Sequence, residues 1–189
     1  MAKTKKLNFG CGKIIKPKEE GWINVDIQKA EGIDKSFDFD KFPYPFKDNT
    51  FDYVFADNVL EHLEKPKKGV EELYRISKKY ATIEIIVPYY KSKWAWGDLT
   101  HKNFFSEISI KELFKEKGYM YNKDKKFEIV GIKMKPSIPF RYFPDIIRKF
   151  LNRYLDNIYS EIRIKARVKK WNEIQKEKRQ KDENFIGYW

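Results

Sequence analysis

The residues with the clearest chemical potential lie near the start of the chain, as a glycine turn followed by an acidic residue. Gly10 and Gly12 flank Cys11 directly after a short apolar run. Because glycine has no Cβ, such a turn lets the backbone approach a ligand closely. Asp26 follows Gly12 by fourteen residues, at the end of a second apolar run. A carboxylate there can accept hydrogen bonds from both hydroxyls of a ribose, so the pair predicts a nucleoside site.

The stretch between the turn and Asp26 argues against a dinucleotide site. Such a site needs a third glycine that opens a helix, and about 20 residues before the acid. Here only residues 13–21, which include Pro17, separate the turn from the next apolar run. A helix in this stretch is limited to a turn or two, shorter than the usual connection between parallel strands.

Strand and helix patterns alternate along the chain, which predicts an α/β fold with a mostly parallel sheet flanked by helices. The expected strands are Lys6–Phe9, Trp22–Ile27, a short one within 37–46, Phe51–Ala56, Ala81–Val87 and Phe127–Met134. The expected helices lie within 59–79, with Pro66 at the start of the main one and Val70, Leu73, Tyr74 and Ser77 on its inner face, and at Ser109–Lys117, capped near Ser106 or Ser109 and closed by Gly118.

The composition changes after Pro136, where basic residues become interspersed with aromatic ones in 145–159 and 160–181. We predict that residues 1–136 form the domain and that 137–189 form a basic helical extension packed on it. An apolar stripe would face the domain and a basic face would point outward. We therefore expect a chain shortened after Ser137 to keep its cofactor site.

The bulk composition suits one soluble domain. The chain has 189 residues, and its net charge of +12 favours acidic partners such as nucleic acid, anionic lipid or phosphorylated metabolites. Lysine and glutamate enrichment also occurs in proteins from hot environments, so charge alone does not select among these partners. A single cysteine excludes an intrachain disulfide and a cysteine zinc cluster, and we expect no metal centre. The absence of a long apolar run and the polar first residues predict a cytoplasmic protein.

Motifs spread over residues 5–118 resemble, in order, those of the class I S-adenosylmethionine-dependent methyltransferases, in a branch with a shortened first crossover. The matching segments are Leu7–Gly12, Gly21–Ile27, Asp38 with Phe42–Val54, Asp57–Leu63, and Asp98–His101 with Phe104, Phe105 and Ser106. The resemblance implies a Rossmann-like fold and S-adenosylmethionine as the cofactor.

The resemblance also implies roles for particular residues. In the family the glycine turn lies against the methionine and ribose of the cofactor, the acid ending the second strand binds the ribose hydroxyls, and a later aspartate contacts the adenine amino group. The implied cofactor-binding positions are Asn8, Phe9, Gly10, Cys11, Gly12, Asp26, Ile27, Asp38, Phe39, Asp57 and Asn58. Asn8 departs from the pattern, because many relatives carry an acid there.

Methyl transfer from a sulfonium requires mainly positioning and removal of the acceptor's proton. We expect His101 as the first candidate base and Asp57 as the second. We interpret Glu61 and His62, at a helix start, as packing or capping groups. The aromatic residues Tyr89, Tyr90, Trp94 and Trp96 either line an acceptor pocket or cover the core.

The sequence leaves more than one class of methyl acceptor open. We expect a small molecule, namely a metabolite, sugar or lipid precursor, because the domain is compact and the expected pocket is aromatic. The basic C-terminal segment favours a nucleic-acid methyltransferase instead. A third alternative is a protein that binds the cofactor without catalysis. The sequence does not indicate the oligomeric state.

Overall fold

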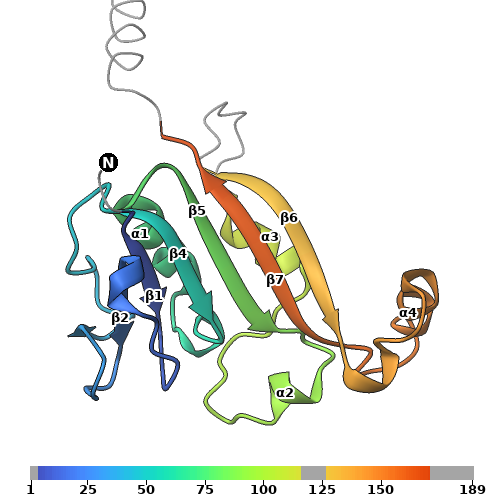
Figure 1. Ribbon diagram of the computed structural model, residues 1–189. Helices are drawn as coiled ribbons and strands as arrows, with labels where there is room; N and C mark the ends of the chain where they lie inside the picture. Colours follow the sequence, from blue (N-terminus) through green and yellow to red (C-terminus); the bar gives the residue numbers. More distant parts are fainter. Residues whose placement is uncertain (1–3, 116–126, 171–189) are drawn as a thin grey trace, which may run out of the picture.

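A computed structural model describes residues 4–115 and 127–170, which form one twisted sheet with helices packed on it (Figure 1). The strands are β1 (Lys6–Phe9), β2 (Trp22–Asp26), β3 (Lys35–Ser36), β4 (Phe51–Asp57), β5 (Ser77–Pro88), β6 (Phe127–Pro136) and β7 (Tyr159–Val168). The helices are η1 (Lys18–Glu20), η2 (Leu60–His62), α1 (Pro66–Ile76), α2 (Lys93–Trp96), α3 (Glu107–Leu113), η3 (Ile138–Phe140) and α4 (Asp145–Leu151). None of these helices is long and apolar enough to cross a membrane.

The sheet has the order β3-β2-β1-β4-β5-β7-β6. β1 to β5 pair in parallel, and β7 runs antiparallel between β5 and β6. The expected α/β fold with a mostly parallel sheet is therefore confirmed.

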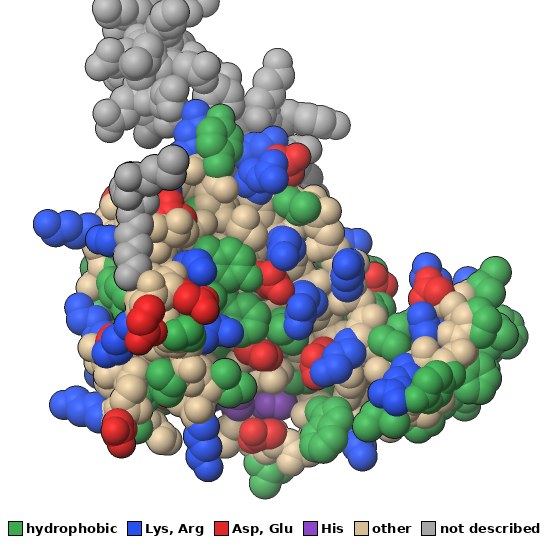
Figure 2. All heavy atoms as spheres, in the orientation of Figure 1, with side chains coloured by type: hydrophobic (Ala, Val, Ile, Leu, Met, Phe, Trp, Pro, Cys, Tyr) green, Lys and Arg blue, Asp and Glu red, His purple; other side chains and the backbone are tan. Residues whose placement is uncertain are grey.

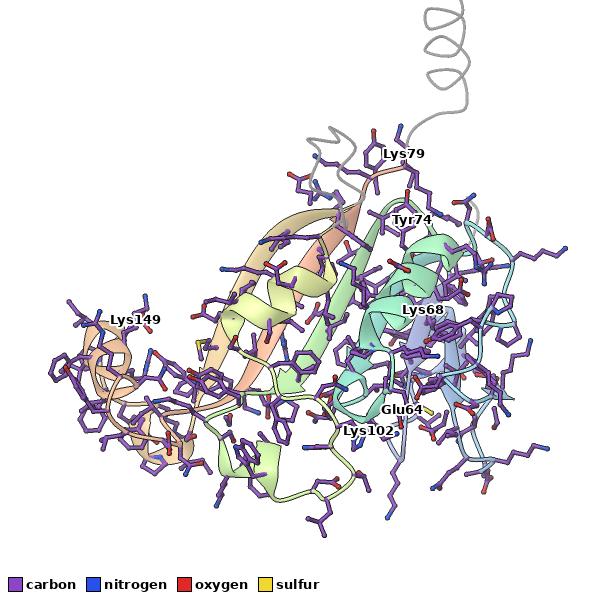
Figure 3. The ribbon with its side chains drawn as sticks, turned by 180° about the vertical axis from the view of Figure 1, so that it is seen from behind. Glu64, Lys68, Tyr74, Lys79, Lys102 and Lys149 are labelled. Atoms are coloured by element: carbon purple, nitrogen blue, oxygen red, sulfur yellow. The ribbon has the colours of Figure 1, made fainter. Side chains whose placement is uncertain are left out.

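Apolar side chains at helical spacing attach α1 to the sheet. Val70, Leu73 and Ile76 are fully buried in the core beside β5, whose Ile83 and Ile85 are equally inaccessible. Pro66 lies at the start of α1 as expected, since its fixed φ suits the first helical turn. Figures 1 and 3 show that α1 and α3 cover the same face of the sheet.

Several expected boundaries differ from the structure. Ser77 begins β5 instead of extending the helix, and β3 lies at Lys35–Ser36, just before the stretch 37–46. Helix α3 begins at Glu107 with Ser106 as its N-cap, and Ser109 returns the capping bond. Gly118, the expected end of this helix, lies outside the described residues.

The largest correction concerns the predicted helical extension. Residues 160–168 belong to β7, in which buried Ile162, Ile164 and Ala166 alternate with exposed side chains. This alternation is the period of a strand with two different faces. Since β7 pairs with β6 of the predicted domain, the boundary at residue 136 does not separate two units. Only α4 and η3 of the described extension are helical, and residues 171–189 lie outside the description.

Candidate functional site

The site is defined by the point where the strand order reverses. From β1 the chain moves outward through β2 to β3, and then returns to the other side of β1 with β4 and β5. In open parallel sheets, ligands bind at the carboxyl ends of the strands beside such a reversal. Gly10–Gly12, Asp26 and Asp57 all stand at these strand ends, so the structure brings the predicted residues to one edge.

The two glycines of the turn have different surroundings. Both have positive φ, +70° at Gly10 and +50° at Gly12. A Cβ on Gly10 would come within 2.2 Å of Cγ2 of Val59, whereas one on Gly12 would meet nothing within 4 Å. Gly10 is thus required by packing against the loop after β4, and Gly12 borders open space that a ligand could enter.

The carboxylate of Asp26 is held beside this open space by two backbone groups. The N–H of Gly12 donates to Oδ2 over 2.8 Å, and the N–H of Gln28 donates to Oδ1 over 3.1 Å. An ionised carboxylate offers about four acceptor positions, so these two bonds leave capacity for two further donors. Ile27, 60% exposed, adds an apolar surface next to it.

Asp38 and Phe39 point in different directions. Asp38 accepts a hydrogen bond from the N–H of Asp40 over 3.0 Å, and its side chain remains 41% exposed. The ring of Phe39 stacks on that of Phe9 with centroids 4.0 Å apart, and both rings are buried. The side chains of Phe9 and Phe39 therefore belong to the core, and only their backbone atoms could meet a ligand.

Asn8 fastens the short first crossover. It is buried, and its amide donates to the carbonyl oxygen of Ile14 over 2.8 Å and to Oδ1 of Asn24 over 2.9 Å. The same Oδ1 accepts from the N–H of Lys16. Burial also raises the pKa of the Cys11 thiol, which lies in the turn. A direct contact of Asn8 or Cys11 with a cofactor stays a prediction.

Asp57 and Asn58 follow at the end of β4. Partial burial raises the pKa of the Asp57 carboxyl, and the negative charge of Glu161 acts in the same direction. Asn58 is exposed, has a φ of +52°, and donates its backbone N–H to Ile86 over 3.0 Å. Asn58 thus turns the chain away from the sheet at the carboxyl edge.

Beyond Asn58 the structure brings Glu61, His62 and His101 together. The rings of His62 and His101 are 4.8 Å apart, and Nε2 of His101 lies 4.0 Å from Oε1 of Glu61. Figure 2 shows histidine atoms reaching the surface of the molecule. Burial raises the pKa of Glu61 to about 8, and burial lowers the pKa of His62. The interpretation of Glu61 and His62 as packing groups missed this cluster. One signal was available: these are the two histidines of the chain, and one of them adjoins a glutamate.

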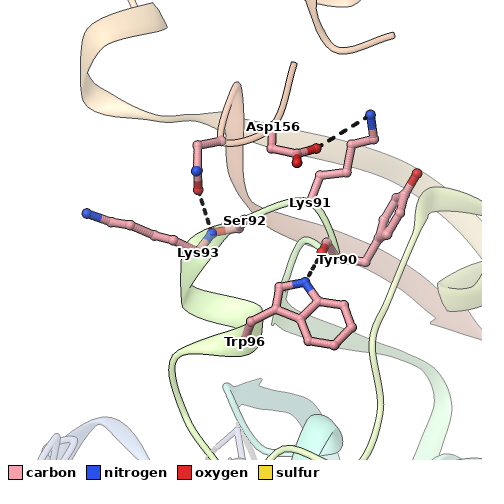
Figure 4. Close-up of a pocket in the computed structure, with 7 residues that line it drawn as sticks. Tyr90, Lys91, Ser92, Lys93, Trp96 and Asp156 are labelled. Atoms are coloured by element: carbon pink, nitrogen blue, oxygen red, sulfur yellow. Dashed lines mark hydrogen bonds and ion pairs between the residues drawn. The ribbon is translucent and has the colours of Figure 1, made fainter. Parts of the chain in front are cut away.

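The aromatic loop after β5 divides between core and surface. Tyr89 is buried and accepts a hydrogen bond from the amide of Asn152, and Trp94 is 63% exposed. Tyr90 and Trp96 line a pocket of about 320 Å³, together with Lys91, Ser92, Lys93, Asp156 and Asn157 (Figure 4). The indole N–H of Trp96 donates to the carbonyl of Tyr90 over 2.7 Å, and its ring stacks on Phe104.

Known proteins resemble this chain in sequence and in fold. Residues 18–84 match the family model of a methyltransferase domain. The chain is 31% identical to norajmaline N-methyltransferase of Rauvolfia serpentina, over 44% of this chain and 30% of that enzyme. It is also 31% identical to an uncharacterised protein of Methanocaldococcus jannaschii, over 53% of this chain and 48% of that protein. The chain thus spans less than half the length of the curated relatives it matches.

A solved structure supports the same fold. A S-adenosylmethionine-dependent methyltransferase from Archaeoglobus fulgidus superposes with a TM-score of 0.63 at 21% identity, over 88% of this chain and 86% of that chain. The sheet and these similarities lead to one conclusion: residues 18–84 match a methyltransferase domain, and the chain has the fold of S-adenosylmethionine-dependent methyltransferases.

Proposed function

We propose that this protein transfers a methyl group from S-adenosylmethionine to a small-molecule acceptor. The observation that carries the proposal is the Asp26 carboxylate, held by the N–H of Gly12 beside open space at the reversal of strand order. This arrangement suits one ribose. In the described residues, the first crossover contains only the three-residue helix η1 and no α-helix that could bind a pyrophosphate, which favours a single nucleoside.

The remaining contacts follow from position along the edge. Asp26 would accept hydrogen bonds from the ribose hydroxyls, Ile27 would lie against the adenine, and Asp38 would accept from the adenine amino group. Gly10–Gly12, with the backbone of the neighbouring Phe9, would border the methionine and ribose. Asp57 and Asn58 would border the methionine end. Asn8 would act through the loop that it fastens.

Bound S-adenosylmethionine supplies a methyl group on a sulfonium leaving group. The protein must therefore hold the acceptor in line and exclude competing water. Where the acceptor carries a proton, Nε2 of His101 and the carboxylate of Asp57 are the two candidate proton acceptors.

The pocket at Tyr90 and Trp96 supports a small acceptor. Its volume of about 320 Å³ lies at the lower end of the range typical of small-molecule sites, roughly 300–1,000 Å³. One relative is named norajmaline N-methyltransferase, a name that gives norajmaline as its methyl acceptor.

The basic residues of β7 support a nucleic-acid acceptor less strongly than their charge alone suggests. Arg163 and Lys165 lie 3.4 Å and 2.9 Å from the buried carboxylate of Glu84, so part of the charge is neutralised within the sheet. Binding to nucleic acid requires lysine and arginine side chains that are available to neutralise its phosphate groups.

The test is methyl transfer measured by mass spectrometry, with a panel of small amines and hydroxyl compounds and with RNA as separate acceptors. We expect transfer to a small compound, and Trp96→Ala should lower its kcat/KM by roughly tenfold through loss of aromatic contact. Trp94→Ala is the matched control, because Trp94 is as exposed as Trp96 but does not line the pocket. Transfer to RNA alone, with a steep dependence on salt, would reject the small-molecule acceptor. Cofactor binding without transfer to any acceptor would favour a protein without catalysis.

A further inference from the structure

Backbone hydrogen bonds bring the Glu61 cluster together from two distant segments. The carbonyl oxygen of Glu61 accepts the N–H groups of Lys102 and Asn103 over 2.7 and 3.0 Å. Figure 3 shows Lys102 beside Glu64, and their ion pair measures 2.7 Å. The loop that carries His101 is thus fixed against η2, so the cluster is built by the fold.

Glu61 is the unusual member of this cluster. Its side chain is 1% exposed, and neither carboxylate oxygen has a hydrogen-bond partner. A buried carboxylate without a partner is strongly destabilising, and such groups are normally paired or bound to a metal. Oε1 of Glu61 faces the imidazole of His101 at 4.0 Å, a distance too long for a hydrogen bond.

The hydrogen bonds of both histidines leave the Nε2 lone pairs free. Nδ1 of His101 lies 2.8 Å from the carbonyl oxygen of Ala95, which can only accept, so Nδ1 carries the proton. Nδ1 of His62 lies 2.9 Å from Oγ1 of Thr100. The hydroxyl of Thr100 already donates to Asp98 over 2.6 Å, so Oγ1 accepts from Nδ1–H of His62. Histidines that ligate metals commonly have this arrangement, with one nitrogen donating to an oxygen.

We propose that Glu61, His62 and His101 bind a divalent transition-metal ion. One ligand atom from each residue lies within 4.8 Å of the other two. Ligands around a tetrahedral ion with bonds near 2.0–2.1 Å are separated by roughly 3.3 Å, so small side-chain rotations must draw the three atoms together. Two imidazole nitrogens and one carboxylate oxygen select zinc-like ions over magnesium or calcium, which prefer oxygen ligands.

Three protein ligands leave a coordination position open, as in catalytic zinc sites. The metal would occupy the Nε2 lone pair of His101, so His101 would be a ligand and not the proton acceptor. An oxygen or nitrogen atom of the acceptor could take the open position and be oriented there. This last consequence rests on the proposed methyl transfer, whereas the metal site does not.

The test uses the untagged full chain, stripped of metal with a chelator, and Zn²⁺, Co²⁺ and Mg²⁺ as probes. Calorimetry should give saturable binding of one Zn²⁺ per chain and no comparable binding of Mg²⁺. Co²⁺ should produce the visible absorption bands of a low-coordinate nitrogen and oxygen site. Glu61→Gln and His101→Gln should each weaken Zn²⁺ binding by at least about tenfold. Thr100→Val, which removes the partner of His62, should weaken it by roughly 10–100-fold.

Glu64→Gln is the matched control, since Glu64 lies on the same segment and is largely exposed. Its Zn²⁺ affinity should equal that of the unaltered chain, and circular dichroism of every variant should report an intact fold. Zn²⁺ binding that is absent in the unaltered chain, or unchanged in both Glu61→Gln and His101→Gln, would overturn the metal site. S-adenosylmethionine binding, measured on the same metal-free protein, separates this failure from a failure of the proposed function.

Discussion

At the scale of single residues, the glycine turn shows how two identical residue types can serve different purposes. Gly10 has no room for a Cβ because Val59 packs against it, whereas Gly12 faces open space. Both have positive φ, a backbone conformation that residues other than glycine rarely adopt. A substitution at Gly12 therefore tests the effect of an added side chain on ligand binding without disturbing the packing, whereas a substitution at Gly10 disturbs both.

We expect Gly12→Ala to lower the free energy of unfolding by only about 1–2 kcal/mol, because its backbone strain is the main cost. The affinity for S-adenosylmethionine should fall by roughly tenfold or more, because the methyl group enters the space assigned to the cofactor. Gly21→Ala is the control: Gly21 has a φ of +84° and precedes β2, at the opposite edge of the sheet. Denaturant unfolding and calorimetry measure both quantities. Equal losses of affinity in the two variants would show that the turn does not lie against the cofactor.

The sequence predicted the polar part of the site better than its surroundings. Gly12 and Asp26 could be placed together because Gly12 follows β1 and Asp26 ends β2, and neighbouring parallel strands end at one edge of the sheet. The burial of Phe9 and Phe39 depends on a cluster of rings that spacing does not indicate. His101 meets Glu61 only through loop hydrogen bonds between distant segments, for which the sequence carries no periodic signal.

At the scale of elements, β7 shows why composition misled the prediction. The segment alternates Ile162, Arg163, Ile164 and Lys165, which is a strand period, but its charge and the helical stretch before it suggested a solvated helix. A strand is stabilised by its neighbours, and these are β5 and β6, about 80 and 30 residues earlier in the chain. By contrast, α3 was predicted near its true start because its cap is local, between Ser106 and Ser109.

At the scale of the whole molecule, the segment after residue 136 completes the sheet. β7 lies between β5 and β6 (Figure 1), and its buried Ile162 and Ile164 join the main core. The stretch 138–156, which carries α4, protrudes from the sheet and exposes large apolar side chains (Figures 1 and 2). Ile138, Tyr142, Ile146 and Tyr154 are each at least 70% exposed.

The expectation that a chain ending at Ser137 keeps its cofactor site must therefore be reversed. Without β7 the inner edges of β5 and β6 lose their partner, so we predict loss of cooperative thermal unfolding. A variant in which a short glycine–serine linker replaces 138–156 should fold, because Ser137 and Ile158 are already joined by a backbone hydrogen bond of 3.0 Å. Circular dichroism melting compares the two. A cooperative transition in the shorter chain would show that β7 is dispensable.

We propose that the carboxyl ends of β1, β2 and β4 bind S-adenosylmethionine through Asp26. Isothermal titration calorimetry of the unaltered chain, Asp26→Ala and Asp48→Ala tests this binding site. Asp48 is a suitable control because it is 66% exposed and pairs with Arg75. We expect the unaltered chain and Asp48→Ala to bind S-adenosylmethionine equally and not to bind NADH. Asp26→Ala should bind roughly ten to a hundred times more weakly, the loss expected for a charged hydrogen-bond acceptor. Unchanged affinity in Asp26→Ala, or tight NADH binding without a response to S-adenosylmethionine, would rule out this binding site.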